Sequence, residues 1–183
     1  MRKLSLCYKL ILYPIAIWGL IWEFWGVGAL MFFTVQSNLL VLIALFLSIV
    51  SPEPSRAKAV FRGITLVAIL ITGVVFNFIW DSYAYGFFIN ITHLVIPTGF
   101  LLDWILFDGH GFLKWRDLPI LLTYPLIYGV LSMLLGVTIY GFFDLSAGVG
   151  TVLMQLVLLT FLMIILGVSI VGFDKILAKR KEK

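Results

Sequence analysis

The stretch Asn90-Ile-Thr-His-Leu-Val-Ile-Pro-Thr-Gly-Phe-Leu-Leu-Asp-Trp-Ile-Leu-Phe107 decides how the rest of the chain is interpreted. It is apolar enough to lie in a lipid bilayer, yet it carries His93 in its first half and Asp103 in its second. Ionisable side chains are costly in hydrocarbon, so they are rare there and usually functional. His93 is the only histidine in a hydrophobic segment, because His110 lies in a polar one. The stretch therefore indicates a membrane-spanning helix that carries a candidate functional residue.

The composition of the whole chain agrees with a membrane protein. Of the 183 residues, 62% are hydrophobic and only 12% are charged, whereas about a quarter of the residues in soluble domains are charged. No long polar segment is present that could form a second domain, so residues 1–183 are expected to form one domain. The single cysteine, Cys7, excludes a disulfide within the chain.

Six hydrophobic segments predict six transmembrane helices. They are expected at about residues 10–25, 29–50, 61–80, 86–107, 118–140 and 149–173, each near the roughly 20 residues that a helix needs to cross a bilayer. Pro52 and Pro54 end the second segment, because proline breaks a helix. Pro119 lies in the first turn of the fifth segment, where its missing N–H does no harm. The sequence thus predicts an all-α fold, a single polytopic bundle of six helices.

The basic residues predict the orientation of this bundle. All 13 of them fall near the two chain ends or between segments two and three or four and five, which places them on one side of the membrane. They are Arg2, Lys3, Lys9, Arg56, Lys58, Arg62, Lys114, Arg116, Lys175, Lys179, Arg180, Lys181 and Lys183. Cytoplasmic loops carry the excess of Lys and Arg, so both termini are expected in the cytoplasm of a cell-membrane protein. The basic tail is expected to contact anionic lipid headgroups rather than nucleic acid.

Polar side chains gather in the outer half of the predicted bundle. They are Thr34, Ser37 and Asn38 in the second segment, Asn77 in the third, and Asn90 and His93 in the fourth, with Glu23 at the outer boundary of the first. The spacing of Thr34, Ser37 and Asn38 puts them on one helix face. From a rise of about 1.5 Å per residue, Thr34 lies roughly 8 Å and His93 roughly 10 Å below the outer surface. Thr34, Asn38, Asn77, Asn90 and His93 are therefore expected to converge on one polar pocket.

Thr34 and His93 are the candidate catalytic pair of this pocket. A hydroxyl group is a poor nucleophile unless a base takes its proton, and histidine suits that role near neutral pH. The amides of Asn38 and Asn77 are candidates to stabilise an oxyanion, and Ser37 and Asn90 are candidates to line the pocket. The alternative remains open that the threonine bonds to a backbone carbonyl and the histidine joins two helices.

Asp103 and Pro97 have different expected roles. Asp103 follows His93 by ten residues, about 15 Å along a helix, so it is too far away to orient the imidazole. It lies at the level of Arg62, and an ion pair between them is expected, with a proton relay as the alternative. Pro97 cannot donate the helical hydrogen bond to the carbonyl of His93, so a kink that opens space at the pocket is expected.

Several motifs resemble those of the androgen-induced gene 1 / FAR-17a family, and in particular its prokaryotic branch. They are Phe33-Thr34-Val-Gln-Ser-Asn-Leu-Leu40, His93-Leu-Val-Ile-Pro97, Leu-Leu-Asp103-Trp-Ile-Leu-Phe107, Tyr124-Pro125-Leu-Ile-Tyr128, Gly136 and Tyr140-Gly-Phe-Phe-Asp144. The resemblance implies an intramembrane threonine hydrolase that cleaves fatty acid esters of hydroxy fatty acids, with Thr34 as nucleophile and His93 as base. The chain departs from the animal pattern at Gln36-Ser37 and in the outer turn, which leaves the lipid ester open.

Two other classes of function remain as alternatives. A small transporter or channel would move a solute or a proton through the polar pocket, although the inner half of the bundle offers little besides Asp103. A non-catalytic membrane scaffold would need neither Thr34 nor His93. No metal site is expected, because one membrane histidine without a nearby Cys, Asp or second His does not complete a ligand set. No cofactor is expected; the expected partners are membrane lipid and a lipid ester, and the oligomeric state is left open.

Overall fold

The computed structural model describes residues 2–24, 26–79, 90–136, 144, 146 and 148–181, and all regular structure in them is helical. The α-helices are α1 (Arg2–Glu23), α2 (Phe33–Val50), α3 (Arg56–Val74), α5 (Ile96–Phe107), α6 (Leu118–Leu134) and α7 (Val149–Lys181). Short 3₁₀ segments, η1 (Val27–Met31) and η5 (Trp115–Asp117), precede α2 and α6. The π-helical segments η2 (Val75–Ile79) and η4 (Ile91–Val95) extend α3 and lead into α5. The all-α prediction is confirmed for these residues.

Several helix boundaries differ from the predicted spans for local reasons. The helices α1 and α7 extend beyond the hydrophobic segments at the two chain ends, because a helix does not stop where the lipid core stops. Helix α2 starts four residues later than expected, since the 3₁₀ turn η1 occupies the space after Gly26. Helix α6 ends before Gly136, whose φ of 63° few other residues adopt. The predicted ends at 25, 80 and 140 and the predicted start at 86 lie outside the described residues.

Five helices of the described chain are long and apolar enough to cross a membrane. They cover Arg2–Glu23, Phe33–Val50, Arg56–Phe78, Trp115–Leu134 and Val149–Arg180. The fourth predicted span appears as a shorter apolar helix, Ile91–Phe107. By their length and composition these helices are compatible with a multi-pass membrane protein.

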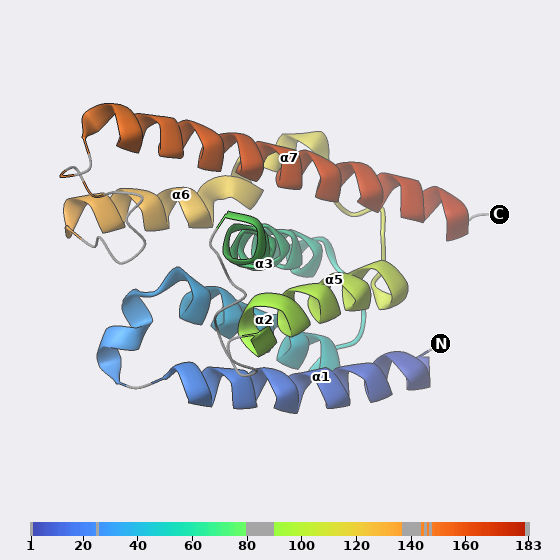
Figure 1. The fold of residues 1–183 in the computed structure, drawn as a ribbon. Helices are drawn as coiled ribbons and strands as arrows, with labels where there is room; N and C mark the ends of the chain where they lie inside the picture. Colours follow the sequence, from blue (N-terminus) through green and yellow to red (C-terminus); the bar gives the residue numbers. More distant parts are fainter. Residues whose placement is uncertain are drawn as a thin grey trace.

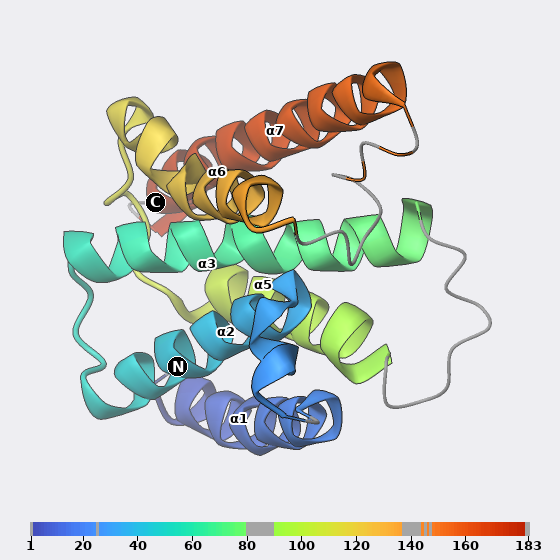
Figure 2. The ribbon, with the colours of Figure 1, turned by 90° about the vertical axis from the view of Figure 1, so that its left-hand side faces the viewer.

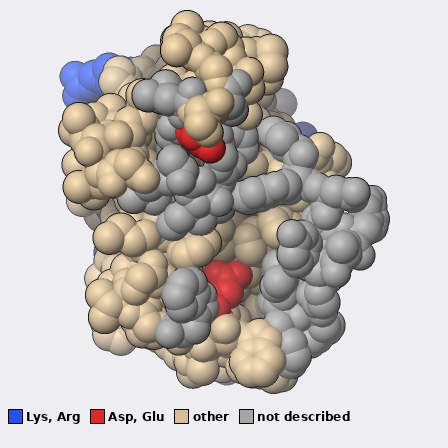
Figure 3. All heavy atoms as spheres, turned by 60° about the vertical axis from the view of Figure 1, so that its left-hand side comes forward, with Lys and Arg blue, Asp and Glu red and all other residues tan. Residues whose placement is uncertain are grey.

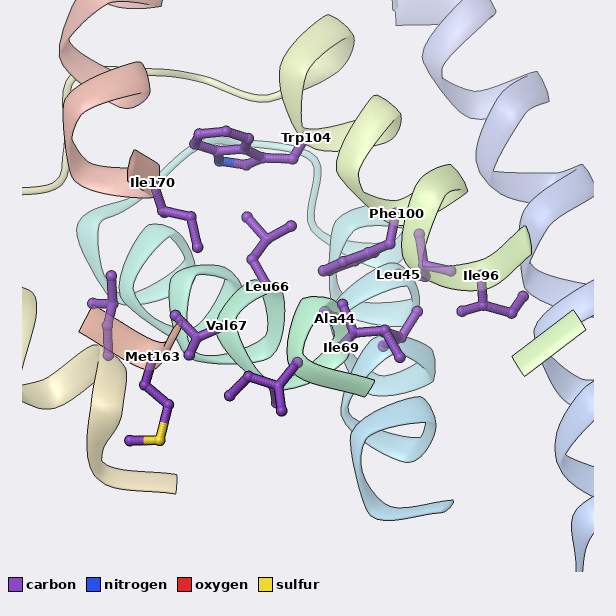
Figure 4. Close-up of a cluster of buried hydrophobic side chains, with 14 of the residues drawn as sticks. Ala44, Leu45, Leu66, Val67, Ile69, Ile96, Phe100, Trp104, Met163 and Ile170 are labelled. Carbon is purple, nitrogen blue, oxygen red and sulfur yellow. The ribbon is translucent and has the colours of Figure 1, made fainter. Parts of the chain in front are cut away.

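Helix α3 forms the centre of the molecule. It packs against α2, α5, α6 and α7, while α1 lies on the far side of α2 and α5 (Figures 1 and 2). Four successive residues of α3, Leu66 to Ile69, are fully buried, as expected for a helix surrounded on all sides. Phe100 and Ile96 from α5 pack beside them in the same apolar cluster (Figure 4).

The two chain ends lie at the same end of the molecule (Figure 1). The segments that join α2 to α3 and α5 to α6 lie at this end as well, because successive helices run in opposite directions. Most of the basic residues belong to these segments and to the helix ends beside them. Figure 3 shows two acidic patches near the middle of the face that it presents, with basic atoms at its edges. The gathering of basic residues at the end that carries the termini is the pattern from which cytoplasmic termini are expected.

Cysteine accessibility tests this orientation. In a Cys7→Ser background, Ser146→Cys places a thiol at the end opposite the termini, and Glu53→Cys places one at the end that carries them; both positions are exposed. In intact cells, we expect a membrane-impermeant maleimide to label Ser146→Cys and to label Glu53→Cys only after permeabilisation. The reverse pattern would contradict cytoplasmic termini.

Candidate functional site

The structure brings Thr34 and His93 into contact. Thr34 lies in the first turn of α2 and His93 in the π-helical segment η4. The Oγ1 of Thr34 lies 3.2 Å from Nε2 of His93, within hydrogen-bonding range. The two residues are nearly buried, with 7% and 9% of their surfaces exposed. A hydroxyl group and a candidate base are thus held together toward the end of the bundle opposite the chain termini.

The other imidazole nitrogen faces a hydroxyl and a carboxylate. The Nδ1 of His93 lies 3.1 Å from Oγ1 of Thr92 and 3.7 Å from Oε1 of Glu23, the last residue of α1. The Thr92 hydroxyl also donates a hydrogen bond to Oε1 of Glu23. The imidazole therefore lies between a candidate nucleophile and an acid, the order of groups that activates hydroxyl nucleophiles in unrelated hydrolases.

Sequence reasoning missed the contributions of Glu23 and Thr92. Residues i and i+1 of a helix do not share a face, so periodicity gave no reason to pair Thr92 with His93. Glu23 had one available signal, since it is the only acidic residue in the first 52 positions and was expected at the same end of the bundle as the polar pocket. Nothing in the spacing indicated which neighbouring helix this carboxylate would face.

A close approach between α1 and η4 delivers Glu23 to the site. A Cβ atom at Gly19 would lie 2.9 Å from Cγ2 of Ile91 and 3.0 Å from Cγ2 of Thr92, so a larger residue would push the two helices apart. Glu23 follows Gly19 by four residues and lies on the same face of α1. Gly19 thus allows the contact, and the helix geometry places the carboxylate beside Thr92.

The backbone of η4 is held by Asn77. Pro97 has no N–H to bond the carbonyl of His93 four residues earlier, and Nδ2 of Asn77 donates to that carbonyl at 2.8 Å. The same nitrogen donates to the carbonyl of Gly73 at 2.7 Å. Around this point η4 is π-helical, and the kink expected at Pro97 stays a prediction. The ring of Phe76 stacks on the imidazole with 3.8 Å between centroids.

The two amides that were candidates for an oxyanion hole serve the backbone instead. Nδ2 of Asn38 donates to the carbonyls of Thr34 and Thr92, at 2.9 and 3.3 Å. Nδ2 of Asn77 likewise has two carbonyl acceptors. An NH₂ group has two donors, so in this conformation neither side chain presents one to an oxyanion. Asn38 thereby fixes η4 to α2, and Asn77 fixes η4 to the end of α3. These bonds position the catalytic candidates.

Ser37 and Asn90 lie on different sides of the site. The Ser37 hydroxyl donates to the carbonyl of Thr34 at 2.9 Å and lies 2.9 Å from Oγ1 of Thr72, so it joins α2 to α3. Asn90 lines a groove of about 600 Å³ between α3 and the fourth helical segment. The groove is lined by Leu70, Gly73, Val74, Asn77, Phe78, Asn90, His93, Leu94, Pro97, Thr98 and Leu101. Its walls are mainly apolar, and His93 belongs to both the groove and the hydrogen-bonded site.

A second polar cluster lies toward the end that carries the termini. Oδ2 of Asp103 lies 2.6 Å from Nη2 of Arg62, so the expected pair is in contact, and Oδ1 lies 2.7 Å from Nζ of Lys9. Nε of Arg62 also lies 2.5 Å from Oδ2 of Asp108. Lys9, Arg62 and Asp103 are buried, and Lys9 and Arg62 line a polar cavity of about 370 Å³. The half of the bundle that carries the termini therefore holds more buried polar groups than the sequence indicates.

Comparisons with family models, with curated proteins and with solved structures gave no match for this chain. The function is therefore argued from the site itself. Among the described residues, no group of three or more His, Cys, Asp or Glu side chains could hold a metal ion.

Removing the Asn77 side chain tests how η4 is held. We expect Asn77→Ala to lower the free energy of unfolding by about 1–3 kcal/mol, because the carbonyl of His93 loses a donor that lipid does not replace. In a Pro97→Ala background the loss should shrink by at least about 0.5 kcal/mol, since a backbone N–H at position 97 offers a substitute donor.

Equilibrium unfolding in mixed micelles, followed by circular dichroism, measures both effects. Asn90→Ala is the matched control, because Asn90 lines the same groove, and it should change the free energy by no more than about 0.5 kcal/mol. An equal loss from Asn77→Ala with and without Pro97 would show that Asn77 does not compensate for the proline.

Proposed function

We propose that this protein is an intramembrane lipid-ester hydrolase in which Thr34 is the nucleophile and His93 the general base. The observation that carries the proposal is the 3.2 Å contact between Thr34 Oγ1 and His93 Nε2. A hydroxyl group becomes an effective nucleophile when a base within hydrogen-bonding distance accepts its proton. The contact supplies this distance without any movement of the two side chains.

The proposed reaction has two balanced steps. In the first, Thr34 Oγ1 attacks the ester carbonyl while Nε2 of His93 takes its proton; the alcohol then leaves with that proton, and an acyl-threonine forms. In the second, a water molecule gives a proton to His93 and attacks the acyl group, and the acid leaves as Thr34 regains its proton. The sum is ester plus water giving acid plus alcohol, with the protein unchanged.

The surroundings of the pair support a lipid ester as the substrate. The groove that includes His93 is mainly apolar, and Phe78 and Leu94 on its wall are exposed, so an acyl chain would enter it from the lipid. With both termini in the cytoplasm, the site would lie near the outer surface, from which water would reach it. The resemblance to the androgen-induced gene 1 / FAR-17a family favours fatty acid esters of hydroxy fatty acids or related lipids. The proposed location is the cell membrane, with both termini in the cytoplasm.

A transporter or channel is the second candidate. The observation that favours it is the polar cavity beside Lys9, Arg62 and Asp108, which adds polar surface to the inner half. Between the two polar clusters, however, Ile96 and Phe100 are fully buried and apolar. Solute or proton flux in proteoliposomes that depends on Asp103 would favour transport over hydrolysis.

Covalent labelling tests the hydrolase directly. We expect a fluorophosphonate probe to label the purified protein in detergent, and Thr34→Ala and His93→Ala to reduce labelling and ester turnover by at least about 100-fold. Thr34→Ser, which keeps a hydroxyl group, should retain labelling. Turnover is measured as release of free fatty acid from a fatty acid ester of a hydroxy fatty acid.

Thr65→Ala is the matched control. Thr65 is a buried threonine of α3 whose hydroxyl donates to the carbonyl of Phe61, away from the site. Its loss removes the same atoms as Thr34→Ala and should leave labelling unchanged. Labelling that persists in folded Thr34→Ala would exclude Thr34 as the nucleophile.

A further inference from the structure

We propose that Glu23 is a positioning residue that, through Thr92, sets the direction of the hydrogen-bonded chain from Thr34 to His93. The chain runs from Thr34 Oγ1 to Nε2 of His93, from Nδ1 of His93 to Thr92 Oγ1, and from Thr92 Oγ1 to Glu23 Oε1. His93 acts as a base on Thr34 only when Nε2 carries no proton. The tautomer of the imidazole is therefore the property that Glu23 has to control.

The number of protons on each group fixes this direction. A carboxylate only accepts hydrogen bonds, and a threonine hydroxyl has a single proton to donate. Because the Thr92 hydroxyl donates to Glu23, its oxygen is the acceptor toward His93, and Nδ1 of His93 carries the proton. A neutral imidazole with a proton on Nδ1 has an unprotonated Nε2. That nitrogen then accepts the proton of Thr34.

The opposite direction would disable the base. If the residue at position 23 donated to Thr92, the Thr92 hydroxyl would donate to Nδ1, and the imidazole proton would lie on Nε2, facing the Thr34 oxygen. In that arrangement His93 holds a proton where it needs a lone pair. The carboxylate at one end of the chain thus decides whether the hydroxyl at the other end can be activated, although the carboxylate does not touch it.

The structure around Glu23 is built to hold it in this place. Gly19 permits the close approach of α1 to η4, and Asn38 fixes the carbonyl of Thr92 from α2. The second carboxylate oxygen, Oε2, is buried and has no hydrogen-bond partner among the described residues. An acidic side chain within an apolar helix is expected to be functional.

The tautomer of His93 can be measured without any assay of activity. The chain has only two histidines, so ¹⁵N-labelled histidine gives two imidazole spectra, and a His110→Gln variant assigns them. We expect the wild type to show the tautomer with its proton on Nδ1 of His93. Glu23→Leu and Thr92→Val should both lose this preference, whereas Glu23→Asp and Thr92→Ser, which keep the donor and acceptor types, should largely retain it.

Fluorophosphonate labelling of the same variants measures how the tautomer of His93 affects the reactivity of Thr34. This expectation rests on the proposed hydrolase function. The labelling rate should fall by about 100-fold in Glu23→Leu and recover at least in part in Glu23→Asp. Asp144→Asn removes an acid at the same end of the molecule and is the matched control, with neither the tautomer nor the rate expected to change. A rate that follows the tautomer supports a positioning role, since a general loss of folding would not be rescued by aspartate.

Two results would overturn the role of Glu23: a wild type with the proton on Nε2 of His93, or a Glu23→Leu variant that keeps the proton on Nδ1. The first can be observed even if no variant folds. A wild type that shows the expected tautomer, loses it in Glu23→Leu and is never labelled would uphold the role of Glu23 in the chain. The same result would count against hydrolysis, so the two proposals fail separately.

Discussion

The pairing of buried polar groups between α1 and the fourth helical segment is the constraint on which the structure depends. A charge that leaves water must find a partner, or the helix that carries it does not remain in the bundle. Lys9 near the start of α1 meets Asp103, and Glu23 at its end meets Thr92 and His93. The two helices run in opposite directions, and they are joined at both ends of their contact. Between the ends, Gly19 and Gly99 allow close packing, since a Cβ at Gly99 would lie 2.8 Å from Leu12.

The contact of Glu23 with Thr92 and His93 depends on the irregular backbone of η4. The side chains of Thr92 and His93 are neighbours in sequence, and in η4 both reach the carboxylate of α1. The π-helical turn and Pro97 leave the His93 carbonyl to be held by Asn77, while Asn38 holds the carbonyls of Thr34 and Thr92. In lipid each of these carbonyls needs a donor from the protein. The amides therefore stabilise a distorted helix, and the distorted helix presents the imidazole to Thr34.

Each kind of sequence pattern predicts only a part of the structure. Hydropathy and proline positions predicted where the helices would form, and depth along the helices predicted that Thr34 could meet His93 and that Asp103 could meet Arg62. Helical periodicity gives the face of a side chain but not the helix that the face touches. For that reason the sequence indicates that Lys9 belongs to the basic flank of the first span and that Glu23 lies at a boundary, but not which helix each of them contacts. The chemistry of the Asn38 and Asn77 amides alone makes them candidates to stabilise an oxyanion. Their contacts show that backbone carbonyls already accept the hydrogen bonds that their NH₂ groups can donate.

The separation of the two polar clusters bears on which function the fold suits. A pathway through a membrane needs polar or water-filled surface from one side to the other, whereas a hydrolase needs access from one side only. Ile96 and Phe100 are fully buried between His93 and Asp103 along the fourth segment, and about 15 Å of helix separates the two ionisable residues. The cluster of Lys9, Arg62 and Asp103 pairs its own charges, so its polarity is accounted for by the partners that it holds. The cluster at the opposite end instead aligns a hydroxyl, an imidazole and a carboxylate beside an apolar groove, an order that recurs in acyl-transfer sites and that supports the proposed hydrolase.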